Sequence, residues 1–148
     1  QLNNRYRTTA TIYLAQIFTT VILIAVGLFF IDSFQGSTSA ATLTALWMAI
    51  VFIAVATFVL RRMLSRWERL KDIKILKGTS GVFTALQTNS IMLGAMAETI
   101  TVIGFIITTF NGEKYDVLRA GAVALNVFLI NFPRKSVWEK IAANLEQI

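Results

Sequence analysis

The sequence contains no cysteine, no histidine and only one proline among its 148 residues. The absence of cysteine excludes disulfides and thiolate chemistry, and the absence of histidine excludes imidazole metal ligands and every catalytic triad that depends on histidine. Charged residues are also scarce, at 15% against about 25% in an average soluble domain. With 55% hydrophobic residues, the chain is too apolar to be an ordinary water-soluble globule.

Long uncharged runs predict four transmembrane helices, because a helix needs about 20 apolar residues to cross a hydrocarbon core of roughly 30 Å. The first run, residues 8–31, follows Arg5 and Arg7, yet it exceeds the 7–15-residue core of a secretion signal. We therefore expect an all-α, polytopic membrane protein of two helical hairpins with cytoplasmic amphipathic helical extensions. The whole chain, 1–148, would form a single membrane domain with spans at about 10–31, 41–60, 82–110 and 115–132.

Basic residues are concentrated on one side of this four-span arrangement. Two lie in the N-terminal arm, seven in residues 61–77 and three in the C-terminal tail, whereas the other side holds only Lys114 and Arg119. The positive-inside rule then predicts that both termini are cytoplasmic, in a prokaryotic-type inner (plasma) membrane. The net charge of +6 accordingly indicates topology, and we expect no nucleic-acid partner because no aromatic-interleaved basic surface accompanies it.

The segment after the second span combines basic residues with a helical pattern. Residues 40–77 contain neither glycine nor proline, and apolar residues recur at steps of three and four. The pattern over 61–78 predicts either a helix that continues span two or one that turns along the membrane interface, and the glycines at 78 and 81 end it. The basic residues either only fix topology or form a lipid- or partner-facing patch, which consists of Arg61, Arg62, Arg66, Arg69, Lys71 and Lys74.

The C-terminal tail repeats this design. Pro133 ends the fourth span, and the four residues from Ser136 to Glu139 fit a capping box. We expect an interfacial helix over 134–148 that lies flat on the cytoplasmic face. Its apolar side would consist of Val137, Trp138, Ile141, Leu145 and Ile148.

Glu98 is the one ionisable residue deep in a predicted span, two residues past the midpoint of 82–110. A charge at that depth is costly, so we expect the carboxyl to be neutral, paired or hydrated. It either serves as hydrogen-bonding glue between helices or handles an ion. The candidate polar partners, at similar depth or on the same helix face, are Gln16, Thr19, Thr20, Gln87, Thr101 and Asn126.

Small residues form stripes on spans three and four. Small side chains let helices approach closely in lipid, so these two spans are expected to be the tightest pair or to build a contact between subunits. The stripe residues are Ala97, Thr101, Gly104 and Thr108 on one span and Ala120, Gly121 and Ala124 on the other.

The helix around the acid, GAMAETITVIGFII at 94–107, resembles the carboxylate helix of rotary ATPase ring proteolipids. Those helices carry a mid-membrane acid in an Ala-x-x-Glu-like setting that is followed by glycine and aliphatic residues. The resemblance implies that Glu98 binds a proton or a sodium ion, with Gln87 and Thr99 or Thr101 as auxiliary ligands. It covers only this segment, and span two lacks the alternating glycines of the family's partner helix.

The sequence carries no pattern for catalysis, since an intramembrane aspartyl protease needs two acids and a serine–lysine dyad needs a lysine within a span. The leading interpretation is therefore a non-enzymatic accessory or scaffold subunit of a larger membrane assembly. One alternative is an ion-coupled or ion-conducting proteolipid centred on Glu98, and another is a small four-helix transporter that acts as an oligomer. The expected partners are membrane lipids and other integral membrane subunits; no cofactor is predicted, and a bound pigment or lipid stays open.

Overall fold

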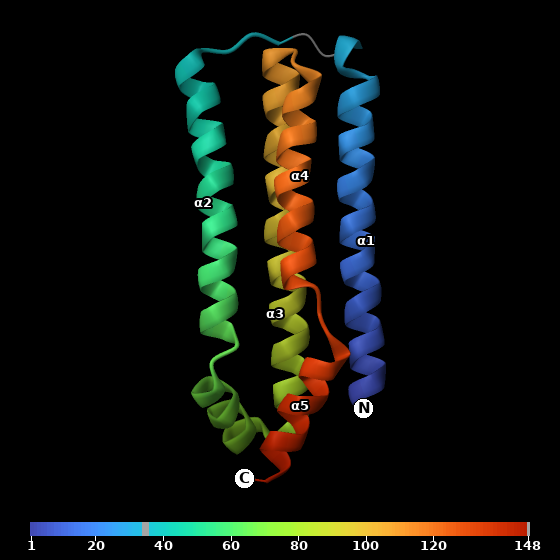
Figure 1. The fold of residues 1–148 in the computed structure, drawn as a ribbon, viewed down its shortest axis with the longest axis vertical. Helices are drawn as coiled ribbons and strands as arrows, with labels where there is room; N and C mark the ends of the chain where they lie inside the picture. The colour runs from blue at the N-terminus through green and yellow to red at the C-terminus, as the bar shows by residue number, and fades with distance from the viewer. Residues whose placement is uncertain (34–35, 148) are drawn as a thin grey trace.

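The computed structural model describes residues 1–33 and 36–147, and these contain helices and turns but no strand (Figure 1). The elements in chain order are α1 (Leu2–Phe29), the short 3-10 helix η1 (Ile31–Ser33), α2 (Ala40–Leu64), α3 (Trp67–Asn111), α4 (Lys114–Asn131) and α5 (Lys135–Glu146). The predicted all-helical class is confirmed. Ile148, the last residue of the predicted C-terminal helix, lies outside the described residues.

Four helical stretches are long and apolar enough to cross a membrane, in agreement with the four uncharged runs. They are α1, α2, α3 and the stretch Lys114–Glu146, which contains α4 and α5. α4 alone has 18 residues and a length of about 27 Å, close to the thickness of a hydrocarbon core. The length and composition of these helices indicate an integral membrane protein.

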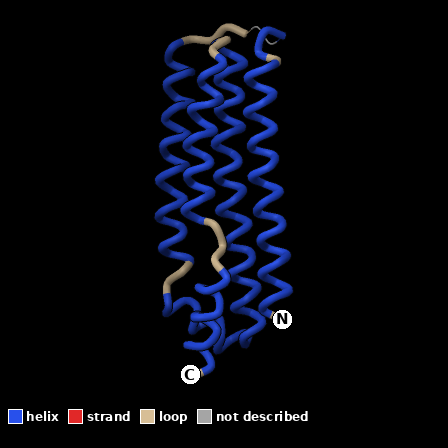
Figure 2. The backbone as a smooth tube through the Cα atoms, turned by 45° about the vertical axis from the view of Figure 1, so that its right-hand side comes forward, coloured by secondary structure: helices blue, strands red, loops and turns tan. Residues whose placement is uncertain are grey.

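The long helices run side by side, with α3 and α4 between α1 and α2 (Figures 1 and 2). Both chain termini lie at the same end of the bundle, together with residues 61–77 and α5. We call this the basic end, because the N-terminal arm, 61–77 and the C-terminal tail hold 12 of the 14 Lys and Arg residues. The opposite, loop end carries η1 and the turn between α3 and α4.

α3 changes direction at Gly78. The φ of 68° and ψ of −175° at this residue are non-helical, although helical residues flank it on both sides. A Cβ at this position would meet no described atom within 4 Å, so the backbone conformation, and not crowding, favours glycine. The break predicted over 78–81 is thus confined to Gly78, and Gly81 lies within the helix.

The basic segment does not continue α2 as one helix. α2 ends at Leu64, and the chain leaves helical geometry at Ser65 and Arg66 before α3 begins at Trp67. This turn lets Leu70, only 1% exposed, pack into the apolar cluster at the basic end. The sequence allowed either a helix that continues span two or a turn after it. The chain turns, because burying Leu70 requires the segment to fold back against the bundle.

The centre of the bundle is a close approach between α3 and α4. A Cβ added to Gly104 would overlap the Cβ of Ala120, so this contact requires glycine. The hydroxyl of Thr108 accepts a hydrogen bond from the backbone N–H of Val117 at 2.7 Å and donates to the carbonyl of Glu113 at 3.2 Å. The remaining predicted packing residues are also buried, namely Ala97, Gly121 and Ala124.

α1 packs against both helices of this pair. The hydroxyl of Tyr13 donates to the backbone carbonyl of Phe128 at 2.9 Å, and its ring meets the Phe128 ring edge-on with centroids 5.3 Å apart. Nearer the loop end, a Cβ on Gly121 would overlap the side chain of Ile24. Aromatic packing and close backbone approach therefore hold three helices around one interior.

α5 folds back against the basic end. Its Trp138 and Leu145 are buried, and the Trp138 ring meets Tyr6 of α1 edge-on, with centroids 5.7 Å apart. The Tyr6 hydroxyl also donates to the carbonyl of Pro133 at 3.1 Å. The link between α4 and α5 is thereby tied to the start of α1.

The predicted capping box at the start of this helix is wrong. The helix begins at Lys135 with Arg134 as its N-cap, and no side chain caps it. Ser136 therefore lies inside the first turn, where its hydroxyl cannot act as the cap. Glu139 instead faces Lys135, with Nζ and Oε1 3.6 Å apart.

Replacing Gly104 by Ala should destabilise the bundle by about 1–3 kcal/mol, because the added methyl meets a Cβ that is fixed to the α4 backbone. Ala120→Gly in the same chain should restore most of the loss. As a matched control, Ala122→Val enlarges an exposed residue of α4 and should change stability by less than about 0.5 kcal/mol. Unfolding of the detergent-solubilised protein with increasing SDS measures these free energies. Equal losses for Gly104→Ala and Ala122→Val would contradict the close contact.

Candidate functional site

The first candidate site is a set of polar residues between α1 and α3. The side chain of Gln16 donates through Nε2 to the carbonyl of Ile91 at 3.3 Å, while its Oε1 is buried without a hydrogen-bond partner among the described residues. A Cβ on Gly94 would overlap this amide, so glycine at that position makes room for it. We call this set the polar seam; it consists of Gln16, Thr20, Gly94, Glu98 and Thr101.

Two buried threonines of the polar seam carry unused hydroxyls. The hydroxyls of Thr20 and Thr101 have no hydrogen-bond partner within the described part of the chain. Many other threonines donate to a carbonyl four residues earlier in their own helix, as Thr9 does to Arg5 at 2.7 Å. Thr20 lies one turn before Ile24, which contacts Gly121, and Thr101 lies one turn before Gly104, which contacts Ala120. Both hydroxyls are therefore near the level of Ala124 along the bundle axis.

Glu98 lies at the edge of this set. Its side chain is half-buried and makes no hydrogen bond or ion pair with any residue that the structure describes. It is one helical turn beyond Gly94 on the same face of α3. Because Gln16 packs on Gly94 and α1 runs parallel to α3, Thr20 reaches the level of the carboxyl. Three oxygens with unused acceptor capacity thus lie within about two turns of Glu98 inside the bundle.

Other predicted partners of the acid lie elsewhere. Gln87 accepts a hydrogen bond from Nη1 of Arg5 at 3.4 Å, and it is about 16 Å from Glu98 along the helix axis. Asn126 is exposed on α4 and donates to the carbonyl of Ala122 at 2.9 Å. Two further candidates are likewise exposed and bond to their own helices, namely Thr19 and Thr99.

The predicted basic patch is spread over two helices and their connection. Arg62, Arg66 and Arg69 are exposed. Lys71 and Lys74 are half-buried, and the Nζ of Lys71 lies 5.8 Å from the centre of the Trp67 ring. The guanidinium of Arg61 donates to the backbone carbonyl of Ile130 near the end of α4, whereas that of Arg69 donates to the nearby carbonyl of Leu64 at 3.4 Å.

A second candidate site is a crevice of about 220 Å³ at the basic end, between the end of α2, α3, the end of α4 and α5. The polar residues that line the crevice are Arg61, Ser65, Asn89, Ser90, Asn131 and Arg134. Asn131 is only 6% exposed; its Nδ2 donates to the carbonyl of Val127 at 3.0 Å, and its Oδ1 has no partner among the described residues. Sequence reasoning placed Arg61 in a candidate site but none of the other five. The available signal was a pair of polar residues, Asn131 and Arg134, on either side of the proline that ends span four.

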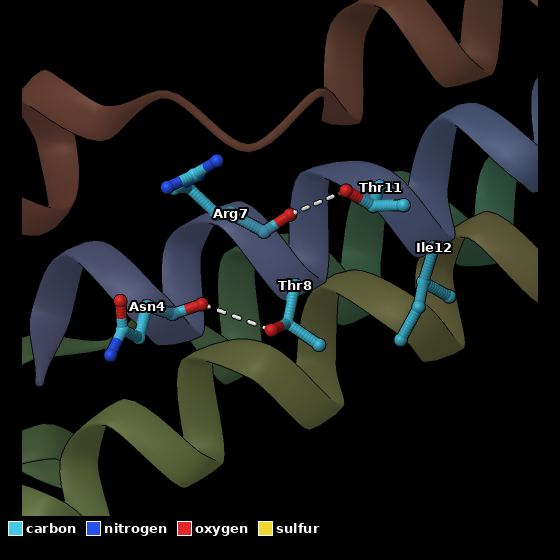
Figure 3. Close-up of a pocket in the computed structure, with 5 residues that line it drawn as sticks. All are labelled: Asn4, Arg7, Thr8, Thr11 and Ile12. Atoms are coloured by element: carbon cyan, nitrogen blue, oxygen red, sulfur yellow. Dashed lines mark hydrogen bonds between the residues drawn. The ribbon is translucent and has the colours of Figure 1, made fainter.

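A third depression lies on α1 near the N-terminus (Figure 3). It is lined by Asn4, Arg7, Thr8, Thr11 and Ile12, all from this one helix. The hydroxyls of Thr8 and Thr11 donate to carbonyls of their own helix at 3.0 and 2.9 Å, as the dashed lines show. With its threonine hydroxyls satisfied and with no second element in its lining, this depression is an outer helix face.

Comparison of the chain with protein-family models, with curated proteins and with solved structures gave no match. Within the described residues, no group of three or more acidic, histidine or cysteine side chains lies close enough together to hold a metal ion. The two sites offer different chemistry. The polar seam presents hydrogen-bond acceptors in an apolar interior, whereas the crevice combines cationic donors with neutral polar groups and therefore suits an anion.

Proposed function

We propose that this protein is a non-enzymatic accessory or scaffold subunit of a larger membrane assembly, with other integral membrane subunits and lipids as its partners. The observation that carries this proposal is the exposure of α2. Only Ile50 and Thr57 of its 25 residues are buried, whereas twelve residues of α3 are buried. One side of α2 packs against the core through half-buried residues, and its other side is left to face lipid or another subunit.

The outward side of α2 has the spacing of a helix-packing seam. Exposed residues recur at alternating steps of four and three, the pattern that sustains left-handed packing between two helices. Alanines near the loop end let a partner helix approach closely. We call this surface the α2 outer row; it consists of Ala41, Ala45, Met48, Phe52, Val55 and Val59.

The proposed setting is a prokaryotic-type inner membrane with both termini in the cytoplasm. The support is the clustering of basic residues at the basic end, because such residues are retained on the cytoplasmic side. The two hairpins would then turn on the outer side of the membrane. The segment at the start of α3 and helix α5 would be cytoplasmic extensions of the bundle.

The absence of native cysteine gives a direct test of the α2 outer row. A photo-crosslinker attached to Phe52→Cys should capture a polypeptide of one defined mass in native membranes, because this residue is 74% exposed on the proposed contact face. Phe18→Cys, a phenylalanine of α1 that is 66% exposed, is the matched control and should yield chiefly lipid adducts. Lipid adducts alone from both positions, with a monomeric mass after gentle extraction, would contradict the subunit proposal.

A second proposal, an ion-coupled proteolipid, draws on the polar seam. Buried oxygens of Gln16, Thr20 and Thr101 lack partners among the described residues, and Glu98 lies near them. A proton on the carboxyl or a bound cation would supply what these acceptors lack. The ancillary ligand Gln87 that the proteolipid resemblance implied is paired with Arg5, so this proposal now depends on the α1 side of the seam.

Glu98→Gln separates the two proposals. In a scaffold subunit this change should alter stability by less than about 0.5 kcal/mol and leave assembly intact, because the carboxyl makes no hydrogen bond to a described residue. In an ion-coupled protein the same variant should assemble and lose proton or sodium flux in reconstituted vesicles. An apolar carbodiimide should then label wild-type Glu98 in its protonated form, and sodium should protect it if the site binds that ion, while the exposed Glu68 serves as the unlabelled control. Labelling of wild-type Glu98 together with unchanged flux in Glu98→Gln would contradict ion coupling.

A further inference from the structure

The crevice at the basic end holds two cationic side chains at the point where α4 stops. Arg61 comes from the last turns of α2, and Arg134 is the N-cap residue of α5. One N–H of Arg61 donates to the carbonyl of Ile130, which leaves most of its five donors free of described partners. No acidic side chain lines the crevice to neutralise the two guanidinium groups.

The same crevice contains polar groups that the chain leaves unsatisfied. Asn131 is buried and lines the crevice, with its Oδ1 unpaired among the described residues. The side chains of Asn89 and Ser90 also make no hydrogen bond to a described residue. A buried acceptor without a partner costs free energy, so a hydrogen-bond donor from outside the chain would be stabilising here.

Apart from Ser65, the remaining lining is apolar and comes from leucines of α2 and α3, from residues 132–133 and from α5. A volume of about 220 Å³ lies below the 300–1,000 Å³ that is usual for pockets for whole small molecules. The crevice thus has room for a small charged group that is attached to an apolar body. A ligand that fits must accept hydrogen bonds from two arginines and donate one to an asparagine oxygen. It must also present hydrocarbon on another side.

We propose that the crevice binds the headgroup of an anionic glycerophospholipid whose phosphate is esterified to a hydroxyl-bearing group, as in phosphatidylglycerol. The phosphate oxygens accept from Arg61 and Arg134, because guanidinium matches phosphate with charge-assisted hydrogen bonds. A headgroup hydroxyl donates to the Oδ1 of Asn131, and the acyl chains extend along the leucines into the surrounding lipid. A zwitterionic choline headgroup offers neither the net charge nor the donor.

This inference deepens the proposed membrane function, because it assumes that the basic end lies at a lipid surface. It adds a defined lipid partner and two residues, Asn131 and Arg134, that the predicted basic patch did not include. Its test uses the purified full-length protein, so the loss of a partner subunit would not affect the result.

The experiment titrates phosphatidylglycerol into the protein in mixed micelles of detergent and phosphatidylcholine, with native mass spectrometry as the readout. The wild type should retain one phosphatidylglycerol in a saturable manner. Arg134→Gln should weaken this binding about tenfold, the loss expected for one charge-assisted hydrogen bond. Arg62→Gln removes the same charge from an exposed residue outside the crevice, and it should change binding by less than about twofold.

Asn131→Leu is the second variant, because it keeps similar volume and removes the acceptor. It should lower the preference for phosphatidylglycerol over phosphatidylcholine while the melting temperature in phosphatidylcholine alone stays near that of the wild type. Equal weakening by Arg62→Gln and Arg134→Gln would overturn the proposal in favour of diffuse attraction to a basic surface. Displacement of the bound lipid by inorganic phosphate, with the same protection against heat, would overturn it in favour of a free-phosphate site.

Discussion

A chain segment in hydrocarbon has to satisfy its own backbone hydrogen bonds, and the other features of this protein depend on that constraint. The four long helices meet it along their length. Backbone groups at helix ends are harder to satisfy, because the last carbonyls of a helix have no hydrogen-bond partner within it. The guanidinium of Arg61 donates to one such carbonyl, that of Ile130, and so ties the end of α2 to the end of α4. Arg61, one of the charges at the basic end, therefore also stabilises the fold by joining two helices.

Buried polar side chains also need hydrogen-bond partners, and they lack them at two places in the interior. Small residues bring α3 and α4 together at Gly104 and Ala120, and most threonines return their hydroxyls to their own helix. The polar seam and the crevice are the two places where buried oxygens stay unpaired within the described residues. Unpaired polar atoms cost stability, and proteins retain such costs mainly at sites of function. The ion-coupling proposal and the inferred lipid site start from these atoms, whereas the subunit proposal starts from the exposed side of α2.

The sequence predicted the features that depend on composition and periodicity, and it could not predict those that depend on helix rotation and pairing. Uncharged runs are enough to find four helices, and small residues are enough to predict a close α3–α4 contact. The outward direction of Asn126 and the pairing of Gln87 with Arg5 depend on the rotation of each helix about its own axis. A sequence that is apolar on nearly all sides of a helix does not define this rotation. The crevice was missed for the same reason, because its residues come from four helices. The third sequence hypothesis, an oligomeric transporter, stays a prediction.

The central claim is that the bundle crosses a membrane with its basic end in the cytoplasm, and labelling of single cysteines tests it most directly. The chain has no cysteine of its own, and Ser37 at the loop end and Asn144 in α5 are both exposed. With a membrane-impermeant maleimide on intact cells, Ser37→Cys should be labelled at once, and Asn144→Cys only after the membrane is permeabilised. Labelling of Asn144→Cys in intact cells, or of both positions from the same side, would contradict the account.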